Sequence, residues 1–408
     1  MSTPPITRTG TSTGTGTGTG TSAGVRVTST TLADGRDLFY FDDSEPYVSG
    51  TATRRLDDPR PLPHRFTPDE HGALPAGPEL RRDPLTGEWV AMAAHRMNRT
   101  FLPPADANPL APAKPGAAYQ DGEIPAEDYD VVVFENRFPS LLRVPGVTDE
   151  VTLRDGEALW QTRPAAGRCE VVCFSADPKA SLRTVGPRRM RTIIEAWVHR
   201  TRALNATEGI EQVFAFENRG SQVGVTLHHP HGQIYALPYL APRTATMLAT
   251  AAEHRARTGR LLGRDVLDAE LRAGTRVVLT SEHWVAYVPF AARWPVEVHL
   301  VPRRDVADLP GLTDDERTDL ATTYLELLRR LDLFFVDDDT AVPLPYISGW
   351  HQAPARQGRD DWRLSLQVFS VLRAPGKLKY LAGVESGVAA WVSDTTPERI
   401  ASRLQELA

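Results

Sequence analysis

The chain has 408 residues, of which 41% are hydrophobic and 24% are charged, and its formal net charge is −6. This balance is typical of a globular protein with room for two domain-sized cores, and its mild acidity disfavours a general nucleic-acid binder. No run reaches the roughly 18 apolar residues of a membrane span, and no apolar secretory segment opens the chain. We therefore expect a cytoplasmic protein that binds neither membrane nor nucleic acid. With only Cys169 and Cys173, a disulfide framework and a four-cysteine zinc cluster are excluded.

The first segment, residues 1–36, contains the run TGTSTGTGTGTGTSAG. Such a composition cannot bury enough apolar surface to offset the entropy of ordering, so it predicts a disordered tail. Two later stretches, residues 43–84 and 103–125, are rich in proline and are expected to be irregular.

Periodic apolar patterns then predict the regular elements. Strands are expected at 130–138, 169–175, 213–218, 232–237, 275–290, 296–302, 345–350 and 363–372. Helices are expected at 188–204, at 314–335 behind a Thr313–Glu316 capping box, and from Pro397 onward. The order strand, helix, strand, strand occurs twice, roughly 130 residues apart, which predicts two similar halves. Short links outnumber helical crossovers, so the fold is expected to be α+β with mainly antiparallel sheet.

The strongest chemical signal is TLHHPHGQIYA at 226–236, which holds three histidines within four positions. His229, His231 and Gln233 alternate, and Pro230 favours an extended backbone, so the three side chains should share one face. Neutral imidazole is a competent nucleophile toward a phosphoryl centre, and an amide N–H can bind a phosphoryl oxygen. The spacing alone leaves three alternatives open: a catalytic site, a metal site or a structural cluster.

The motif HPHGQ at 229–233, preceded by FENRG at 216–220, closely resembles the galactose-1-phosphate uridylyltransferase family of the histidine-triad superfamily. Further segments match in the same order, namely RRDPLTGEWV (81–90), HRMNR (95–99), VFENRF (133–138), VPFAARWPVE (288–297), PYISGWHQAP (345–354) and LKYLAGVES (378–386). The resemblance implies two histidine-triad-like repeats, with the nucleophile in an N-terminal half (37–240) and a C-terminal half at 241–408.

The resemblance also implies a ping-pong reaction. His231 would take the uridylyl group of UDP-glucose and release glucose 1-phosphate, and galactose 1-phosphate would then accept that group to give UDP-galactose. In this scheme His229 orients His231, and Gln233 stabilises phosphoryl charge.

Substrate-binding roles follow from the same matches. Arg96 and Arg99 correspond to phosphate-contacting arginines, Asn136 to a nucleotide contact, and Asn218 and Thr226 to positions near the sugar phosphate. Lys379 and Glu385 correspond to a pair that binds hexose hydroxyls from the partner subunit, which implies a homodimer with shared active sites.

The metal sites of the family look lost. Its zinc ligand positions read Asn108, Ala111 and Pro178, and only His229 remains. At a second metal site His351 remains, while the other positions read Met247, Ser365 and Gln367. One imidazole cannot hold tetrahedral zinc, so we expect no structural metal and no cofactor.

Two other functions stay open on the sequence. One is another nucleotidyltransferase of the superfamily, such as a sugar-nucleotide phosphorylase. The other is a non-catalytic protein that binds a sugar nucleotide.

Overall fold

The structure of the chain is a computed structural model that describes residues 19–22, 24–73, 75, 77–98, 103, 107–114, 122–336 and 343–408. Within these residues the helices are α1 (Gly186–Asn205), α2 (Pro242–Thr258), α3 (Leu262–Ala273), α4 (Asp314–Asp332), α5 (Gly383–Val388) and α6 (Pro397–Glu406). The strands of the main sheet are β1 (Thr19–Ser22), β2 (Val25–Thr31), β3 (Asp37–Asp42), β6 (Val131–Glu135), β9 (Arg168–Cys173), β10 (Gln212–Arg219), β11 (His231–Leu237), β12 (Val277–Thr280), β13 (Trp284–Tyr287), β14 (Val296–Pro302), β15 (Tyr346–His351) and β16 (Ser365–Ser370). Smaller sheets are formed by β4 (Glu79–Arg82), β5 (Trp89–Met92), β7 (Thr152–Leu153) and β8 (Gln161–Pro164), and by β17 (Leu372–Ala374) and β18 (Lys377–Leu378).

The main sheet confirms the predicted α+β class, because every neighbouring pair of its strands is antiparallel. Its central strands run in the order β9-β11-β10-β15-β16-β14. The first three belong to the series β9, α1, β10, β11, and the last three to the series β14, α4, β15, β16. The second series therefore mirrors the first, and the two meet where β10 pairs with β15.

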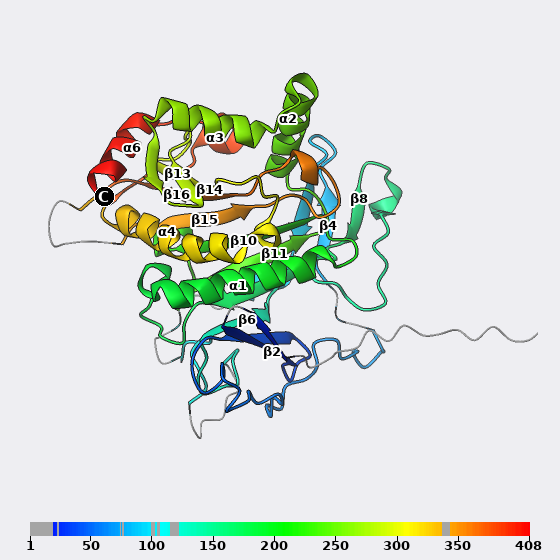
Figure 1. The fold of residues 1–408 in the computed structure, drawn as a ribbon. Helices are drawn as coiled ribbons and strands as arrows, with labels where there is room; N and C mark the ends of the chain where they lie inside the picture. Colours follow the sequence, from blue (N-terminus) through cyan, green and yellow to red (C-terminus); the bar gives the residue numbers. More distant parts are fainter. Residues whose placement is uncertain are drawn as a thin grey trace, which may run out of the picture.

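Helices α1 and α4 pack side by side against one face of this sheet (Figure 1). Their apolar residues form one large core with inward residues of both halves, including Ile193 and Trp197 from α1, Leu320 and Leu327 from α4, and Ile234 from β11. Side chains alternate along a strand, so Val171 and Cys173 of β9 belong to a second core on the opposite face. That opposite face carries the functional side chains described below.

Different segments cover the opposite face in the two halves. Over the first half lie irregular segments that contribute Leu110, Ile124 and Tyr129 to the second core. Over the second half lie α2 and α3, and Leu267 of α3 packs with Tyr287 and Val301. Neither α2 nor α3 was predicted from the sequence. In α2 only Thr244 and Ala251 are buried, so this helix has no apolar stripe. In α3 only Leu267 and Glu270 are buried.

The predicted disordered tail is wrong for the part that the structure describes, because β1 (Thr19–Ser22) pairs with β2 in the main sheet. Strand β2 pairs with β3 from Arg26 to Thr31, and Val25, Thr28 and Thr30 are buried. Threonine is β-branched and packs well in strands, so a run with few apolar residues can still join a sheet when its neighbours cover it. Residues 1–18 lie outside the described residues, and the division of the chain at residue 240 stays a prediction. No described helix is both long and apolar enough to span a membrane.

Candidate active site

Strand β11 positions the two central residues of the HPHGQ motif. His231 lies opposite Cys173 of β9, and Gln233 lies opposite Val171, so both side chains share the face away from α1, as predicted. Gly232 stands between them because a Cβ there would come within 2.8 Å of the Phe174 ring and of the Phe216 carbonyl oxygen. His231 and Gln233 line a cavity of about 150 Å³.

The His231 imidazole is held in one orientation by its own motif. Its Nδ1 lies 2.7 Å from the carbonyl oxygen of His229, and a carbonyl only accepts, so Nδ1 carries the proton and donates it. The Nε2 lone pair is therefore free. Burial lowers the pKa of His231 below its usual range, which keeps the ring neutral at neutral pH. A neutral imidazole with a free Nε2 can act as a nucleophile.

The cavity walls carry cationic side chains. Arg96, on a short 3-10 helix (Ala94–Asn98), lines the cavity and donates from Nη1 to the Phe138 carbonyl oxygen at 2.7 Å. Arg137 also lines it, and no ion-pair partner of Arg137 occurs among the described residues. The one acidic lining residue, Glu123, is paired with buried Arg36 at 2.7 Å. Because Arg36 neutralises the Glu123 carboxylate, the two arginines give the cavity lining a net positive charge, which attracts an anionic ligand.

Two of the three predicted polar contacts line the same cavity, and the third lies on a neighbouring strand. Asn136 and Thr226 line it. The Asn136 Oδ1 accepts the Phe138 backbone N–H at 2.8 Å, which fixes the turn after β6. Asn218 does not line the cavity, but Phe216 pairs with Gln233 and Glu217 with Gly232, so one further step along this ladder sets Asn218 beside His231 on the same face.

His229 was expected to share one face with His231 and Gln233, but it does not line the cavity with them. It precedes β11, is only 2% exposed, and is enclosed by protein partners. Its Nδ1 lies 2.9 Å from Asn108 Nδ2, and its Nε2 lies 2.7 Å from the Tyr129 hydroxyl and 2.8 Å from the Ser175 carbonyl oxygen. Burial lowers the pKa of His229 to about 4, so its ring is neutral.

The predicted hexose-binding pair forms a contact of its own away from this cavity. Lys379 Nζ lies 3.1 Å from Glu385 Oε1 and also donates to the Val392 carbonyl oxygen. This hydrogen bond to Lys379 lowers the pKa of Glu385. Neither residue lines the His231 cavity. Arg99 lies outside the described residues.

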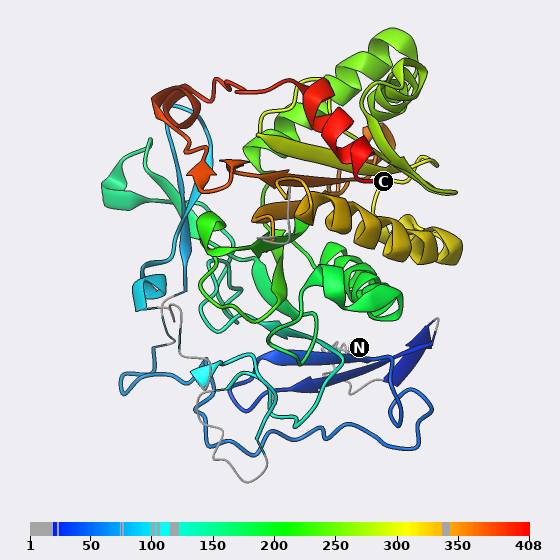
Figure 2. The same cartoon turned by 90° about the vertical axis from the view of Figure 1, so that its left-hand side faces the viewer.

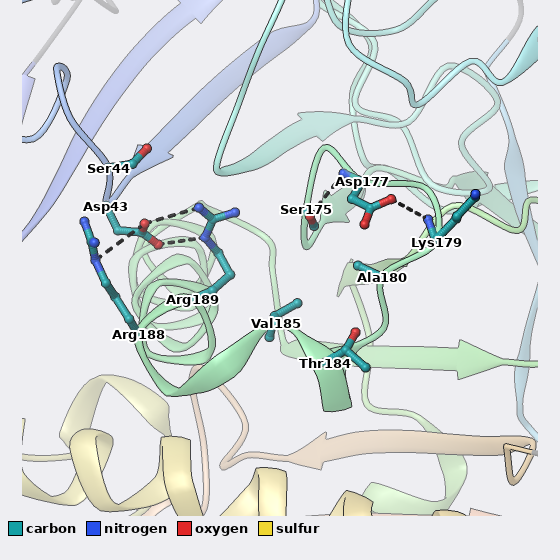
Figure 3. A pocket seen from close by; sticks show the side chains of 10 residues that line it. All are labelled: Asp43, Ser44, Ser175, Asp177, Lys179, Ala180, Thr184, Val185, Arg188 and Arg189. Carbon is teal, nitrogen blue, oxygen red and sulfur yellow. Dashed lines mark hydrogen bonds and ion pairs between the residues drawn. The ribbon is translucent and has the colours of Figure 1, made fainter. Parts of the chain in front are cut away.

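A wider hollow of about 660 Å³ lies beside the start of α1 (Figure 3). Among its charged residues, Asp43 binds Arg189 at 2.7 Å and Arg188 at 3.7 Å, and Asp177 accepts the Lys179 backbone N–H. It holds neither histidine of the motif, so the smaller cavity at β11 is the candidate active site.

The residues at the two positions that the family resemblance assigns to metals form hydrogen bonds among themselves. At the first, Asn108 donates to the one nitrogen of His229 that could carry a lone pair, and the other positions hold Ala111 and Pro178. At the second, His351 Nε2 bonds to Gln367 Oε1 at 3.2 Å, beside Met247 and Ser365. No group of three histidine, cysteine or carboxylate side chains that could hold a metal ion occurs in the described part of the chain. Cys169 and Cys173 are buried free thiols on β9.

Sequence reasoning missed several residues of the site. Arg137, Phe138, Leu110 and Glu123 line the cavity, and Tyr129 supports it. Arg137 lies inside the recognised segment VFENRF, so its cationic side chain beside Asn136 was the available signal. Nothing in the sequence pairs Tyr129 with a histidine 100 residues away.

Comparison with known proteins shows the family to which the chain belongs. The family models for the N-terminal and C-terminal domains of galactose-1-phosphate uridyl transferase match residues 65–241 and 248–408. A galactose-1-phosphate uridylyltransferase of Streptomyces lividans is 43% identical over 94% of this chain and 98% of its own length. That of Thermotoga maritima is 32% identical over 80% of this chain and 98% of its own length. These are nucleotidyl-transferring enzymes. The chain belongs to the galactose-1-phosphate uridylyltransferase family.

Solved structures show the same relationship. One described as the structure of uridylyltransferase is 32% identical, with a TM-score of 0.70 over 81% of this chain and 98% of that one. An ADP-glucose phosphorylase from Arabidopsis thaliana with bound ADP-glucose has a TM-score of 0.59 at 23% identity, covering 81% of this chain and all of that one, and so shares the fold.

Proposed function

We propose that the chain is a hexose-1-phosphate uridylyltransferase that carries the uridylyl group on His231. The observation that supports this most directly is the hydrogen bond from His231 Nδ1 to the His229 carbonyl oxygen, since it leaves Nε2 unprotonated and facing a cavity lined by arginines. The family relationship supports UDP-glucose as donor and galactose 1-phosphate as acceptor.

The first half-reaction uses the free lone pair of His231. Nε2 attacks the α-phosphorus of UDP-glucose, the N–P bond forms, and the bond from that phosphorus to the bridging oxygen breaks. Glucose 1-phosphate leaves with the electron pair of that bond. Nδ1 keeps its proton throughout, and the His229 carbonyl stabilises the positive charge that develops on the ring.

The second half-reaction reverses the first with another sugar. A phosphate oxygen of galactose 1-phosphate attacks the same phosphorus, the N–P bond breaks, and UDP-galactose leaves. The leaving group is a sugar phosphate in the first half-reaction and the His231 imidazole in the second. Both are weak bases, so no general acid is needed. Gln233, which cannot donate a proton as a third histidine could, suits such a transfer. Its amide N–H, with Arg96 and Arg99, would bind the non-bridging phosphoryl oxygens. His229 serves by orienting His231.

Recognition of the substrates is assigned to the remaining predicted residues. Asn136 would contact the nucleotide, and Asn218 and Thr226 the sugar phosphate. Zinc is common in the family, but no cofactor is expected here, because the donor sets at the two metal positions do not suit one. We also place the protein in the cytoplasm and both halves in the histidine-triad class.

The covalent intermediate gives the decisive test. Incubation with UDP-glucose labelled in the uridylyl group should leave the label on the wild-type chain and none on His231→Ala. The matched control is His299→Ala, which alters a histidine of the second repeat outside the cavity and should keep the label. Label on His231→Ala, or loss of label from His299→Ala alone, would refute the assignment.

Shared sites in a homodimer are supported by exposed apolar residues. Leu85 (94% exposed) lies between β4 and β5, and Trp160 precedes β8, while Tyr380 (77% exposed) lies between Lys379 and α5. The small sheet and α5 lie on the same side of the molecule, at the left of Figure 2. Exposed apolar residues on one side of a molecule suit a protein–protein interface, and such an interface would bring Lys379 and Glu385 to the partner's cavity.

Mixed dimers test this arrangement. Co-expression of the inactive variants His231→Ala and Lys379→Ala should restore activity, because one site of each heterodimer then has both residues intact. If the co-expressed variants show no uridylyltransferase activity, shared sites are excluded.

A sugar-nucleotide phosphorylase is the second candidate, favoured by the shared fold of the ADP-glucose phosphorylase. An acceptor screen separates the two. Faster turnover with inorganic phosphate than with any sugar 1-phosphate would decide for the phosphorylase, and tight UDP-glucose binding without exchange would indicate a non-catalytic binding protein.

A further inference from the structure

Each hydrogen-bonding group around the His229 ring has a partner in the structure. The Asn108 side-chain N–H donates to Nδ1, so Nδ1 is unprotonated and the ring proton is on Nε2. The Nε2–H then donates to the Ser175 carbonyl oxygen and to the hydroxyl oxygen of Tyr129. The Tyr129 hydroxyl donates its own proton to the Leu110 carbonyl oxygen at 2.8 Å. A single tautomer of His229 satisfies the whole network.

Both polar atoms of the Asn108 side-chain amide also have hydrogen-bond partners. Asn108 Oδ1 accepts the Leu110 backbone N–H at 3.0 Å, so both ends of its amide are used and its donor must face His229. Tyr129 is buried, and its ring lies beside the His229 ring with centroids 6.4 Å apart. In a buried site, such a fully paired network is rigid, because any rotation leaves a polar group unpaired.

Three segments far apart in the sequence meet in this network. Asn108 and Leu110 come from the segment that lines the His231 cavity, Tyr129 precedes β6, and Ser175 follows β9 at the rim of the hollow in Figure 3. Here side-chain hydrogen bonds join them, at the positions where the sequence lacks metal ligands.

We propose that Asn108 and Tyr129 are positioning residues that replace a metal ion, holding His229 and, through its main chain, the nucleophile His231. The His229 carbonyl fixes the His231 tautomer, so a shift of the His229 backbone would misalign Nε2. A misplacement of about 1 Å can cost roughly 10²-fold in rate. This inference rests on the proposed function for its kinetic readout.

The kinetic test uses Tyr129→Phe and Asn108→Ala. The rate of label uptake from UDP-glucose in a single turnover should fall by about tenfold or more in each, with little change in the dissociation constant of UDP-glucose. The matched control is Tyr47→Phe, which removes a surface hydroxyl that contacts Asp128 and should leave the rate unchanged. Unchanged rates in both site variants, or an equal loss in the control, would overturn the proposal.

A spectroscopic test is independent of activity. In wild-type protein carrying ¹⁵N-labelled histidine rings, His229 should be unprotonated at Nδ1 and His231 unprotonated at Nε2. Asn108→Asp replaces the donor by an acceptor of the same shape, so Nδ1 of His229 should gain a proton. A proton on Nδ1 of His229 in the wild type would overturn the network, whether or not the protein transfers uridylyl groups.

Metal analysis completes the design. Protein purified from zinc-supplemented cells should hold no stoichiometric metal, and chelator treatment should leave both label uptake and thermal stability unchanged. Stoichiometric zinc, or chelator-sensitive uptake restored by zinc, would refute the replacement. Absence of label on the wild type would instead refute the proposed function, with the nitrogen signals still testing the network.

Discussion

The two repeats share one topology but differ in what covers them. In the first, irregular segments lie over β9 and β11 and leave a cavity of about 150 Å³ with His231, Gln233 and two arginines. In the second, α2 and α3 lie over β14 and β16, and a hollow of about 290 Å³ is lined largely by apolar side chains such as Met247 and Val266. Two repeats with the same strand order therefore carry cavities with different linings.

Gln233 on β11 and Gln367 on β16, the corresponding strand of the second repeat, also differ in their surroundings. Gln233 faces an open cavity, whereas Gln367 on β16 is 3% exposed and its Nε2 donates to Glu297 at 2.7 Å. One glutamine is available to a ligand, and the other is used within the fold. The repeat supplies the same framework twice, and the covering segments determine whether a side chain binds substrate or stabilises the structure.

The largest expected effect concerns the cover of the first repeat. Arg36 is 3% exposed and pairs with Asp34 and Glu123, both at 2.7 Å. Arg36→Met should lower the free energy of unfolding by about 3–5 kcal/mol, because it leaves the buried Glu123 carboxylate without its ion-pair partner. Denaturant unfolding measures this. The exposed pair of Arg55 and Asp57 provides the control, since Arg55→Met should change stability little. Equal effects would mean that the ion pair of Arg36 with Glu123 does not hold the covering segment in place.

The next prediction compares the two glutamines. Gln233→Ala should lower turnover by about 10²-fold with little loss of stability, because it removes one donor to phosphoryl charge. Gln367→Ala should keep turnover per folded molecule but lose about 1–3 kcal/mol of stability, because Glu297 loses a hydrogen bond. Steady-state kinetics and thermal unfolding on both variants test the pair. The reverse pattern would assign the chemistry to the second repeat.

A smaller effect is expected at the seam between the repeats. Glu217 of β10 is buried and accepts a hydrogen bond from the Tyr346 hydroxyl of β15 at 2.6 Å. Burial raises its pKa to about 7 from 4.5. The folded chain thus keeps a proton that the unfolded chain releases, and stability falls as pH rises from 4.5 to 7.

Replacing that carboxyl should remove this pH dependence. Glu217→Gln is expected to match the wild type near pH 4.5 and to be more stable by about 2–3 kcal/mol above pH 7. Unfolding measured across this range gives the answer. A wild-type stability that does not fall over the range would show that Glu217 is ionised in the folded protein.

Much of the framework followed from the sequence, because it depends on local periodicity. The strands of both repeats, α1, α4, and the capped starts of α4 and α6 were predicted, since apolar stripes and caps are visible residue by residue. The site was predicted where one short motif carries it, at His231 and Gln233. Arg96, Asn136 and Thr226 were found through the family resemblance and line the same cavity.

The predictions that failed concern residues whose partners lie far away in the sequence. Strand β2 joins the sheet because β3 lies beside it, and its own threonine-rich sequence resembles a flexible linker. Asn108 was recognised only as a missing cysteine, because its bond to His229 spans 121 positions in the chain. Side-chain pairing of this range has no periodic signal.

The tryptophans give the repeated architecture a thermodynamic consequence. Trp197 of α1 contacts Trp350 of β15 edge-on, and Trp350 contacts Trp284 of β13 in the same way, with centroids 6.1 Å apart in each pair. All three belong to one core that draws on both repeats. Neither repeat keeps a complete core when the other unfolds. We therefore expect the two to melt as one cooperative unit, so that a substitution that destabilises the second repeat also weakens the candidate active site of the first.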